Sequence, residues 1–205
     1  MKLVRNIVAT VAFAALCAAS AVAQDQAAAP AQAGPPVLAK NIATPRAGGM
    51  RMMVTSSSFA SGDVLPDRYT QFGDNMSPSI TWSKGPIGTL SYVVMAEDSG
   101  VNRHDPIVHW IVYDLPSTSD KLAQGVPTAP KLENGAGQGK NVRGEAGYLG
   151  PKPPAGQTHP YHFQVFALNA RLNIDPATAD RATVIAAMKG KVLASGDLVG
   201  MVTGK

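Results

Sequence analysis

Short apolar runs separated by turn residues dominate the middle of the chain. Each run is four to ten residues long and ends near Gly, Pro or a polar residue, which is the pattern of short β-strands. Trp82 and Trp110 lie within such runs and are expected in the core. The strands are predicted over 51–55, 79–82, 90–95, 106–115 and 161–167.

One segment has the pattern of a helix instead. Asp180 can cap a helix over 181–189, and Gly190 is a typical residue just after a helix end. The apolar positions of this helix form one stripe, made of Val184, Ile185 and Met188. Because no helix separates each pair of predicted strands, the pattern favours an antiparallel all-β or α+β core over an alternating parallel fold.

The N-terminus has the pattern of a secretory signal peptide. Lys2 and Arg5 precede an apolar stretch over 7–19, and the small residues of 21–23 suit cleavage before Gln24. A periplasmic or secreted protein is therefore expected. The Ala-, Pro- and Gln-rich stretch 24–49 is predicted to be a flexible tether, and 50–205 to be one folded domain.

Composition excludes several classes of protein. Cys17, the single cysteine, lies in the predicted signal peptide, so the mature chain would hold no disulfide, catalytic thiol or Cys-ligated zinc. Removal of Lys2 and Arg5 leaves 16 basic against 14 acidic residues, and no basic run alternates with aromatic residues. Nucleic acid is therefore not an expected partner, and the mature chain has no predicted transmembrane segment.

Three polar residues stand at the ends of predicted strands. His109 lies near the start of the strand 106–115, His159 precedes the strand 161–167, and Asp98 follows the strand 90–95. Two strands that begin with histidine can place both imidazoles at one rim of a sheet. Asp98 could join them there and accept a hydrogen bond from one imidazole, which fixes its tautomer.

Motifs spread along the whole predicted domain match those of a known family. On these motifs the chain resembles the phosphatidylethanolamine-binding protein family, in the bacterial branch often labelled Raf-kinase-inhibitor-like. The matching residues are Ser58-Phe59, Gly62, Leu65-Pro66, Tyr69-Thr70, Gly73, Asn75, Ser77-Pro78, Trp82, Glu97-Asp98, His109-Trp110, Leu115-Pro116, Gly139-Lys140-Asn141, Gly147-Tyr148, Gly150-Pro151, Pro153-Pro154, Gly156, His159, Tyr161, Ala187-Met188, Gly190, Val192-Leu193 and Leu198-Val199-Gly200.

The resemblance implies an antiparallel β-sandwich-like fold with a Greek-key element and a few peripheral helices. It also implies a small anion pocket lined by Asp98, His109, His159 and Tyr161, with the backbone of Gly150-Pro151 as one wall. Imidazole N–H groups and a phenol O–H can donate to phosphate oxygens. The expected protein is non-enzymatic, uses no cofactor and binds a small phosphate-bearing molecule or a lipid head group.

Three positions depart from the family motifs and leave the identity of the ligand open. Gly100 stands where the usual Asp-Pro-Asp-Ala-Pro motif has its second acid, so the pocket rim is expected to lose a carboxylate. Lys152 replaces the cysteine of the Gly-Pro-Cys-Pro-Pro motif. Pro160 replaces the arginine of the His-Arg-Tyr triplet.

Other functions fit some of the same residues. Asp98, His109 and His159 have the composition of a two-histidine, one-carboxylate metal face. Ser99 beside Asp98, with His109 nearby, raises the possibility of a serine hydrolase, but adjacent side chains on an extended chain point in opposite directions. The long Gly-rich loops of 116–150 suit an inhibitor of a protease or another extracytoplasmic enzyme.

Overall fold

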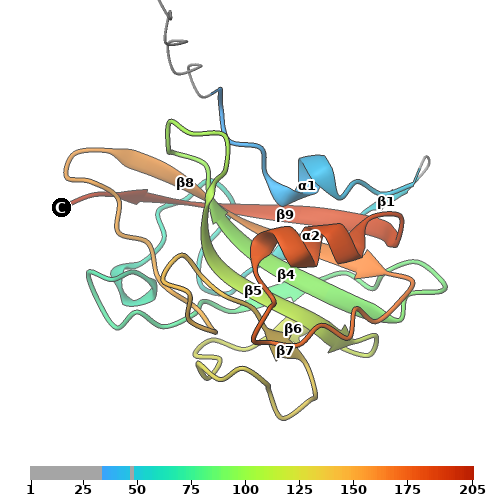
Figure 1. The fold of residues 1–205 in the computed structure, drawn as a ribbon. Helices are drawn as coiled ribbons and strands as arrows, with labels where there is room; N and C mark the ends of the chain where they lie inside the picture. Colours follow the sequence, from blue (N-terminus) through green and yellow to red (C-terminus); the bar gives the residue numbers. More distant parts are fainter. Residues whose placement is uncertain (1–33, 47–48) are drawn as a thin grey trace, which may run out of the picture. The chain divides into compact units, whose positions relative to one another are not determined.

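The structure is a computed structural model that describes residues 34–46 and 49–205, so the predicted signal peptide lies outside the described residues. The strands form two sheets (Figure 1). The larger sheet has the order β1-β9-β8-β4-β5-β7, and the smaller one the order β2-β3-β6. The bounds are β1 Met50–Arg51, β2 Val54–Thr55, β3 Ile80–Trp82, β4 Ser91–Asp98, β5 Ile107–Pro116, β6 Lys121–Leu122, β7 Gly137–Gln138, β8 Thr158–Leu168 and β9 Val192–Thr203.

The expected mainly β, antiparallel architecture is confirmed, with one exception. β4 lies between β5 and β8 and is antiparallel to both, whereas the short β1 runs parallel to β9. All eight residues of β4 are buried, because both faces of the larger sheet are covered. A strand covered on both faces is a continuous apolar run, which is why 90–95 was readable from the sequence.

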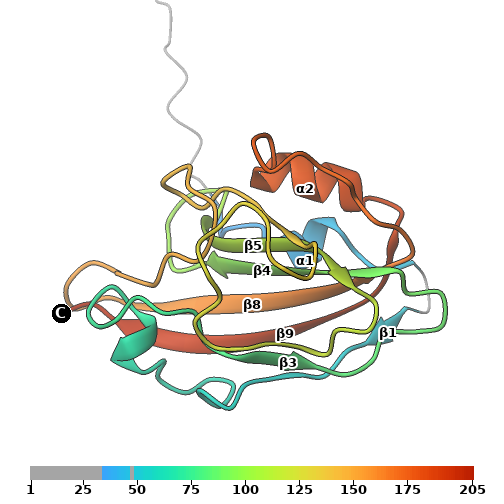
Figure 2. The same cartoon turned by 90° about the horizontal axis from the view of Figure 1, so that it is seen from below.

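Two hydrophobic cores lie on opposite faces of the larger sheet. One is shared with the smaller sheet and contains both tryptophans, as expected; it includes Trp82, Tyr92, Trp110, Tyr148 and Phe163. The other lies beneath the helices α1 (Ala39–Ile42) and α2 (Arg181–Met188) and includes Val93, Met95, Ile111, Phe166 and Met188. Figure 2 shows α2 on one side of β4, β5 and β8 and the strand β3 on the other.

The predicted helix is confirmed as α2. The Asp180 carboxylate accepts a hydrogen bond from the Thr183 backbone N–H at 2.8 Å, and this bond is the main cause of the lowered pKa of Asp180. The expected apolar stripe is buried against the sheet. Gly190 follows the helix with a φ of +72°, a conformation that glycine adopts without steric cost.

The described part of the range 24–49 departs from the expected flexible tether. Residues 39–42 form α1, and Leu38, Ala39 and Ala43 are buried. The Ala39 backbone N–H donates to the buried Glu97 carboxylate at 2.8 Å, and the Lys40 backbone N–H donates to Gln164. These contacts join the segment to β4 and β8, so it is packed against the sheet.

One expectation about an individual strand needs correction, and one long strand was not predicted. The single strand predicted over 51–55 is two strands, because the Met52 N–H donates to β9 at Ser195 whereas Met53 pairs with Ser83 beside β3. The chain therefore crosses from the larger sheet to the smaller one at this point. β9 itself, twelve residues long, was not predicted.

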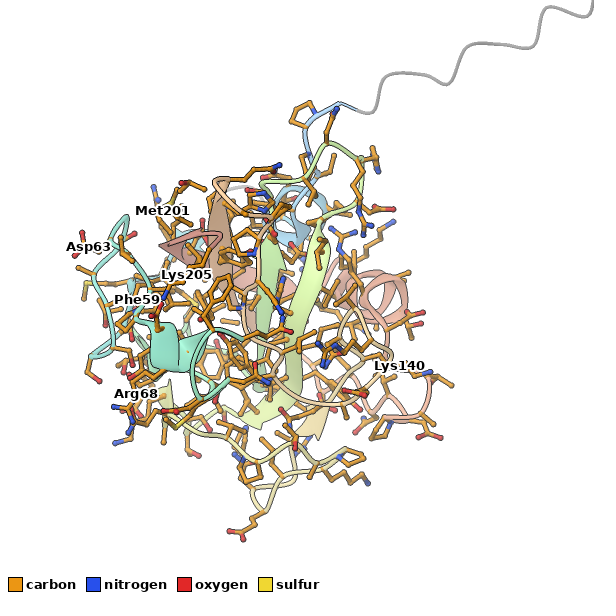
Figure 3. The ribbon with its side chains drawn as sticks, turned by 90° about the vertical axis from the view of Figure 1, so that its left-hand side faces the viewer. Phe59, Asp63, Arg68, Lys140, Met201 and Lys205 are labelled. Carbon is orange, nitrogen blue, oxygen red and sulfur yellow. The ribbon has the colours of Figure 1, made fainter. Side chains whose placement is uncertain are left out.

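The segment before the 3₁₀ helix η1 (Asp67–Tyr69) extends the outer edge of β9. The Met201 N–H donates to the Asp63 carbonyl oxygen, and the Leu65 N–H donates to that of Met201. Figure 3 labels Asp63 and Met201 on one side of the described domain and Lys140 on the opposite side. Within the described ranges, no helix has both the length and the apolarity needed to cross a bilayer.

Candidate functional site

Three strand ends meet at one rim of the larger sheet. β4 ends at Asp98, which pairs with Ile107 of β5 on one side and with Tyr161 of β8 on the other. His109 and His159 each lie two residues from one of these partners, so the predicted placement of both imidazoles at one rim is confirmed. The register also shifts between Ala96 and Glu97, which makes His109 the extra residue of a β-bulge. Bulges redirect side chains locally.

Tyr161 lies between the two imidazole rings. Its ring centroid is 5.1 Å from that of His109, in an edge-to-face arrangement. The His159 ring is nearly parallel to the Tyr161 ring at 6.5 Å. Burial, with the Asp98 carboxylate as a smaller cause, raises the pKa of Tyr161, so its phenol stays protonated at neutral pH.

The Asp98 carboxylate orients His159. The Nδ1–H of His159 donates to Asp98 Oδ2 at 2.9 Å, with Oδ1 at 3.1 Å. The expectation that Asp98 accepts from one histidine is therefore confirmed. The other imidazole nitrogen, Nε2, lies 3.3 Å from the Gln157 side-chain oxygen. The interaction with Asp98 leaves Nε2 as the nitrogen available to a ligand.

A backbone carbonyl orients His109. Its Nδ1 lies 2.7 Å from the Leu149 carbonyl oxygen, which can only accept, so Nδ1 carries the proton. Burial lowers the pKa of His109, although the Leu149 hydrogen bond and the nearby Asp98 both act in the opposite direction. The neutral ring therefore predominates near pH 7. Its Nε2 atom is buried and has no hydrogen-bond partner within the described part of the chain.

This geometry corrects the expectation that both imidazoles donate to an anion. In neutral His109, Nε2 is an acceptor, because the single ring proton is held at Nδ1. An oxyanion can bind it only if a proton comes with the ligand or is taken up from solvent. A buried acceptor without a partner costs about 1–3 kcal/mol, so the site gains free energy when a donor reaches it.

The predicted wall at Gly150-Pro151 lies beside His109. The Gly150 N–H donates to the Asn75 side chain at 2.7 Å, and the Gly150 carbonyl accepts from the Gln71 side chain at 2.6 Å. The Pro151 carbonyl accepts from the Gln71 backbone N–H. A Cβ atom at position 150 would lie 2.7 Å from Asn75 Oδ1, so the close approach of these two loops requires glycine.

The segment after β4 covers the site. A Cβ atom at position 100 would lie 2.3 Å from Cγ of His159, so Gly100 packs directly on the imidazole. Its N–H donates to Asp98 Oδ1 at 2.7 Å. Only 5% of His109 and of His159 and 2% of Tyr161 is exposed. Gly100 therefore does more than remove a carboxylate from the rim, because any larger residue would collide with His159 in this arrangement.

The comparisons with known proteins agree with this architecture. A family model described as "Phosphatidylethanolamine-binding protein" matches residues 55–203. The chain belongs to the phosphatidylethanolamine-binding protein family. A UPF0098 protein of Aquifex aeolicus is 40% identical over 159 residues, which cover 76% of this chain and 90% of the relative.

Two solved structures of the same family have similar folds. YbcL of Escherichia coli, described as a member of the mammalian PEBP family, has a TM-score of 0.70 at 30% identity. The alignment covers 76% of this chain and all of YbcL. The PEBP homologue CT736 of Chlamydia trachomatis has a TM-score of 0.67 at 32% identity, with 76% of this chain and 99% of that chain covered.

The structure also bears on two alternative interpretations of these residues, the metal site and the serine hydrolase. Within the described ranges, no group of three or more His, Asp or Glu residues has the geometry of a metal site. Ser99 points away from Asp98 and His109, and its hydroxyl contacts His162 of β8 instead. The proposed grouping of Ser99 with Asp98 and His109 is therefore wrong.

Sequence reasoning missed the group that orients His109 and the second contact of His159. The Leu149 carbonyl carries no side-chain signal, and Gln157 lies in a loop of ordinary composition. Asn75 did carry a signal, because its residue type is enriched among non-glycine residues with positive φ, and its φ is +54°.

Proposed function

We propose that this PEBP-family protein is an exported binding protein for phosphate esters, which it holds through Asp98, His109, His159 and Tyr161. One observation carries the proposal: two oriented imidazoles meet around a protonated phenol, and one of them has a buried nitrogen without a partner. Phosphate oxygens are strong acceptors and a phosphate monoester can also carry a proton, so such a ligand can satisfy all three groups.

The orientation of the rings determines which groups donate and which accept in the complex. Tyr161 donates its phenol proton to a phosphate oxygen. His159 donates from Nε2 to the phosphate when its ring carries both protons, because Nδ1–H is held by Asp98. His109 accepts from a protonated phosphate oxygen, or donates after taking up a proton itself. Both arrangements hold at least one proton more than a phosphate dianion and a neutral His109 hold separately.

Access to the site requires movement of the segment that follows β4. Gly100 lies on His159, and the Gly100 N–H bond to Asp98 holds the segment in place. A ligand that reaches the imidazoles must displace this short segment. The loss of one such hydrogen bond costs about 1.5–3 kcal/mol when the acceptor is charged, which a phosphate ligand can offset with its own charge-assisted bonds.

Calorimetric titration with O-phosphorylethanolamine tests the proposal. The wild-type chain should bind, and His159→Gln should weaken binding about tenfold or more, since it removes a bond to a charged ligand worth about 1.5–3 kcal/mol. His104→Gln is the matched control, because the His104 side chain is 72% exposed and pairs only with its exposed neighbour Asp105. Absence of heat with the folded wild type at millimolar ligand refutes the proposal.

Vesicles that contain phosphatidylethanolamine distinguish a lipid head group from a free phosphate ester. Binding to vesicles that is lost in His159→Gln identifies the lipid as the source of the phosphate. If a partner enzyme binds and is inhibited equally by wild type and His159→Gln while phosphate esters do not bind, the protease-inhibitor alternative replaces the present proposal. Export is tested separately by fractionation of cells that express the full chain.

A further inference from the structure

A second group of polar residues lies on the opposite face of the larger sheet. Successive residues of a strand point to opposite faces, so His162 faces away from its neighbours Tyr161 and Phe163, which belong to the site and the inter-sheet core. Ser99 follows Asp98 at the end of β4 and also points to this second face. Asp197 of β9 lies two pairs along the same ladder and completes the group.

Two hydrogen bonds join these three side chains in series. The Nδ1–H of His162 donates to Asp197 Oδ2 at 2.9 Å. The other imidazole nitrogen, Nε2, lies 3.1 Å from the Ser99 hydroxyl oxygen. Because the carboxylate holds the ring proton at Nδ1, Nε2 of the neutral ring is the atom that can accept the serine proton. This is the connectivity of an activated serine: carboxylate, oriented imidazole and hydroxyl.

The carboxylate is held in its ionised form. Burial alone would raise the pKa of Asp197, but hydrogen bonds from His162 and Lys40 outweigh burial, and the pKa is lowered. Lys40, the second residue of α1, pairs with the same Oδ2 atom. The His162 and Asp197 side chains are 14% and 13% exposed, and Ser99 is half-buried, so all three residues keep some contact with solvent.

We propose that Ser99, His162 and Asp197 form a nucleophilic site that takes acyl groups from small activated esters. The site is separate from the phosphate site, since it lies on the other face of the sheet and shares no residue with it. This reactivity goes beyond the proposed binding function and departs from the expectation of a non-enzymatic protein.

Acyl transfer to Ser99 and the following hydrolysis need only the ester, water and the three side chains. Ser99 Oγ forms a bond to the carbonyl carbon of the ester and passes its proton to His162 Nε2. The bond from that carbon to the leaving oxygen then breaks, and the leaving alcohol takes the proton from His162. Water repeats the sequence: it adds to the acyl carbon, gives a proton to His162, and releases the carboxylic acid as Ser99 Oγ regains the proton.

The backbone around Ser99 limits the substrate class. The Ser99 N–H donates to the Pro160 carbonyl at 3.2 Å, and the Gly100 N–H donates to Asp98. Neither N–H is therefore free to stabilise an oxyanion, and each such donor is worth about 10²–10³ in rate. The site should accordingly react with esters that have a good leaving group and not with amides.

Labelling with a fluorophosphonate probe tests the proposal on the full chain. Ser99 Oγ would displace fluoride from phosphorus, so the intact mass rises by one phosphonyl group, and peptide mass spectrometry should place it on Ser99. His162→Gln should slow labelling about 100-fold or more, which is the usual contribution of a general base. p-Nitrophenyl acetate should be hydrolysed, and the corresponding p-nitroanilide should not.

Matched variants separate activation from folding. Ser117→Ala removes an exposed serine and His104→Gln an exposed histidine, and both should label at the wild-type rate. Asp197→Asn should slow labelling whereas Asp197→Glu should restore part of it, a difference that a merely structural role would not produce. Wild-type protein that acquires no phosphonyl group, or acquires it on serines other than Ser99, overturns the proposal whether or not the variants fold.

Discussion

The buried carboxylate of Glu97 gives the sharpest prediction about stability. Glu97 is completely buried at the centre of a network that joins α1, the larger sheet and α2. Its Oε1 accepts from Arg181 Nε at 2.6 Å, and its Oε2 accepts from Gln164 and from the Ala39 N–H. Arg181, with 15% of its side chain exposed, also donates to the Val37 carbonyl.

Arg181→Met should remove the cation and leave the buried charge uncompensated. Breaking a buried ion pair in this way costs about 3–5 kcal/mol. For a chain of this length that loss lowers the melting temperature by roughly 6–20 °C, at about 2–4 °C per kcal/mol. Urea denaturation followed by circular dichroism measures the free energy of unfolding directly.

Two further variants check the reasoning. Arg46→Met removes an exposed arginine whose contact is a hydrogen bond to the Gly190 carbonyl, and it should change stability by only about 0.5 kcal/mol. Adding Glu97→Gln to Arg181→Met should recover part of the loss, because the buried group then carries no charge. A loss below 1 kcal/mol in Arg181→Met, or a double variant less stable than both single ones, would refute this account of the network.

Three other outcomes follow from the phosphate site. The dissociation constant for O-phosphorylethanolamine should rise at least about tenfold per pH unit above pH 7. The reason is that the complex holds a proton that the phosphate dianion, with its second pKa near 6, has lost. Calorimetry at pH 6, 7 and 8 measures the dissociation constant, and a constant value contradicts the prediction. The free energy of unfolding should fall as pH drops below 6.5, because the unfolded chain protonates His109 at its ordinary pKa whereas folding lowers that pKa. Urea denaturation at several pH values should therefore give unfolding free energies that diverge between wild type and His109→Gln below pH 6.5. Parallel pH dependences in the two proteins would argue against the buried neutral ring. Gly100→Ala should shift the NMR signals of His159, since the added Cβ would lie 2.3 Å from its ring, whereas Gly34→Ala, with open space around the added carbon, should not; identical His159 signals in both would show that the segment does not pack there.

The sequence was sufficient to predict those strands and the helix whose structure follows from the local pattern of residues. The strand β4 is a buried run, β5 is buried over most of its length, and the predicted part of β8 alternates between apolar residues and His162, Gln164 and Phe166. The helix α2 begins at a capping aspartate. The three strand ends could be located from these runs. The grouping of Asp98 with His159 then followed from the antiparallel arrangement and from the family resemblance.

The features that were missed depend on contacts distant in sequence. β9 places Gly196 and Gly200 at core-facing positions, where Met52 and Phe59 pack against the bare backbone, so no apolar run marks the strand. α1 is only four residues long, and it packs because Glu97, 58 residues away, accepts its first N–H. An Ala- and Pro-rich stretch carries no local signal for such a contact.

The surroundings of His109 and His162 also depend on contacts between residues that are distant in sequence. The tautomer of His109 is set by the Leu149 carbonyl, forty residues away. The series of Ser99, His162 and Asp197 needs the order of three strands, which only the folded sheet supplies. Sequence reasoning paired Ser99 with its neighbour in the chain, whereas the sheet pairs it with a residue 63 positions away.

The side-chain nitrogen signals of the four histidines test the central claim most directly. A long-range ¹H–¹⁵N NMR spectrum resolves Nδ1 and Nε2 of each ring before and after addition of O-phosphorylethanolamine. We expect Nε2 of His109 and of His159 to shift on binding, with both Nδ1 protons retained, while the signals of the exposed His104 stay unchanged. A ligand that binds but shifts only His104 or His162, or none of the four, would contradict a phosphate site between His109 and His159.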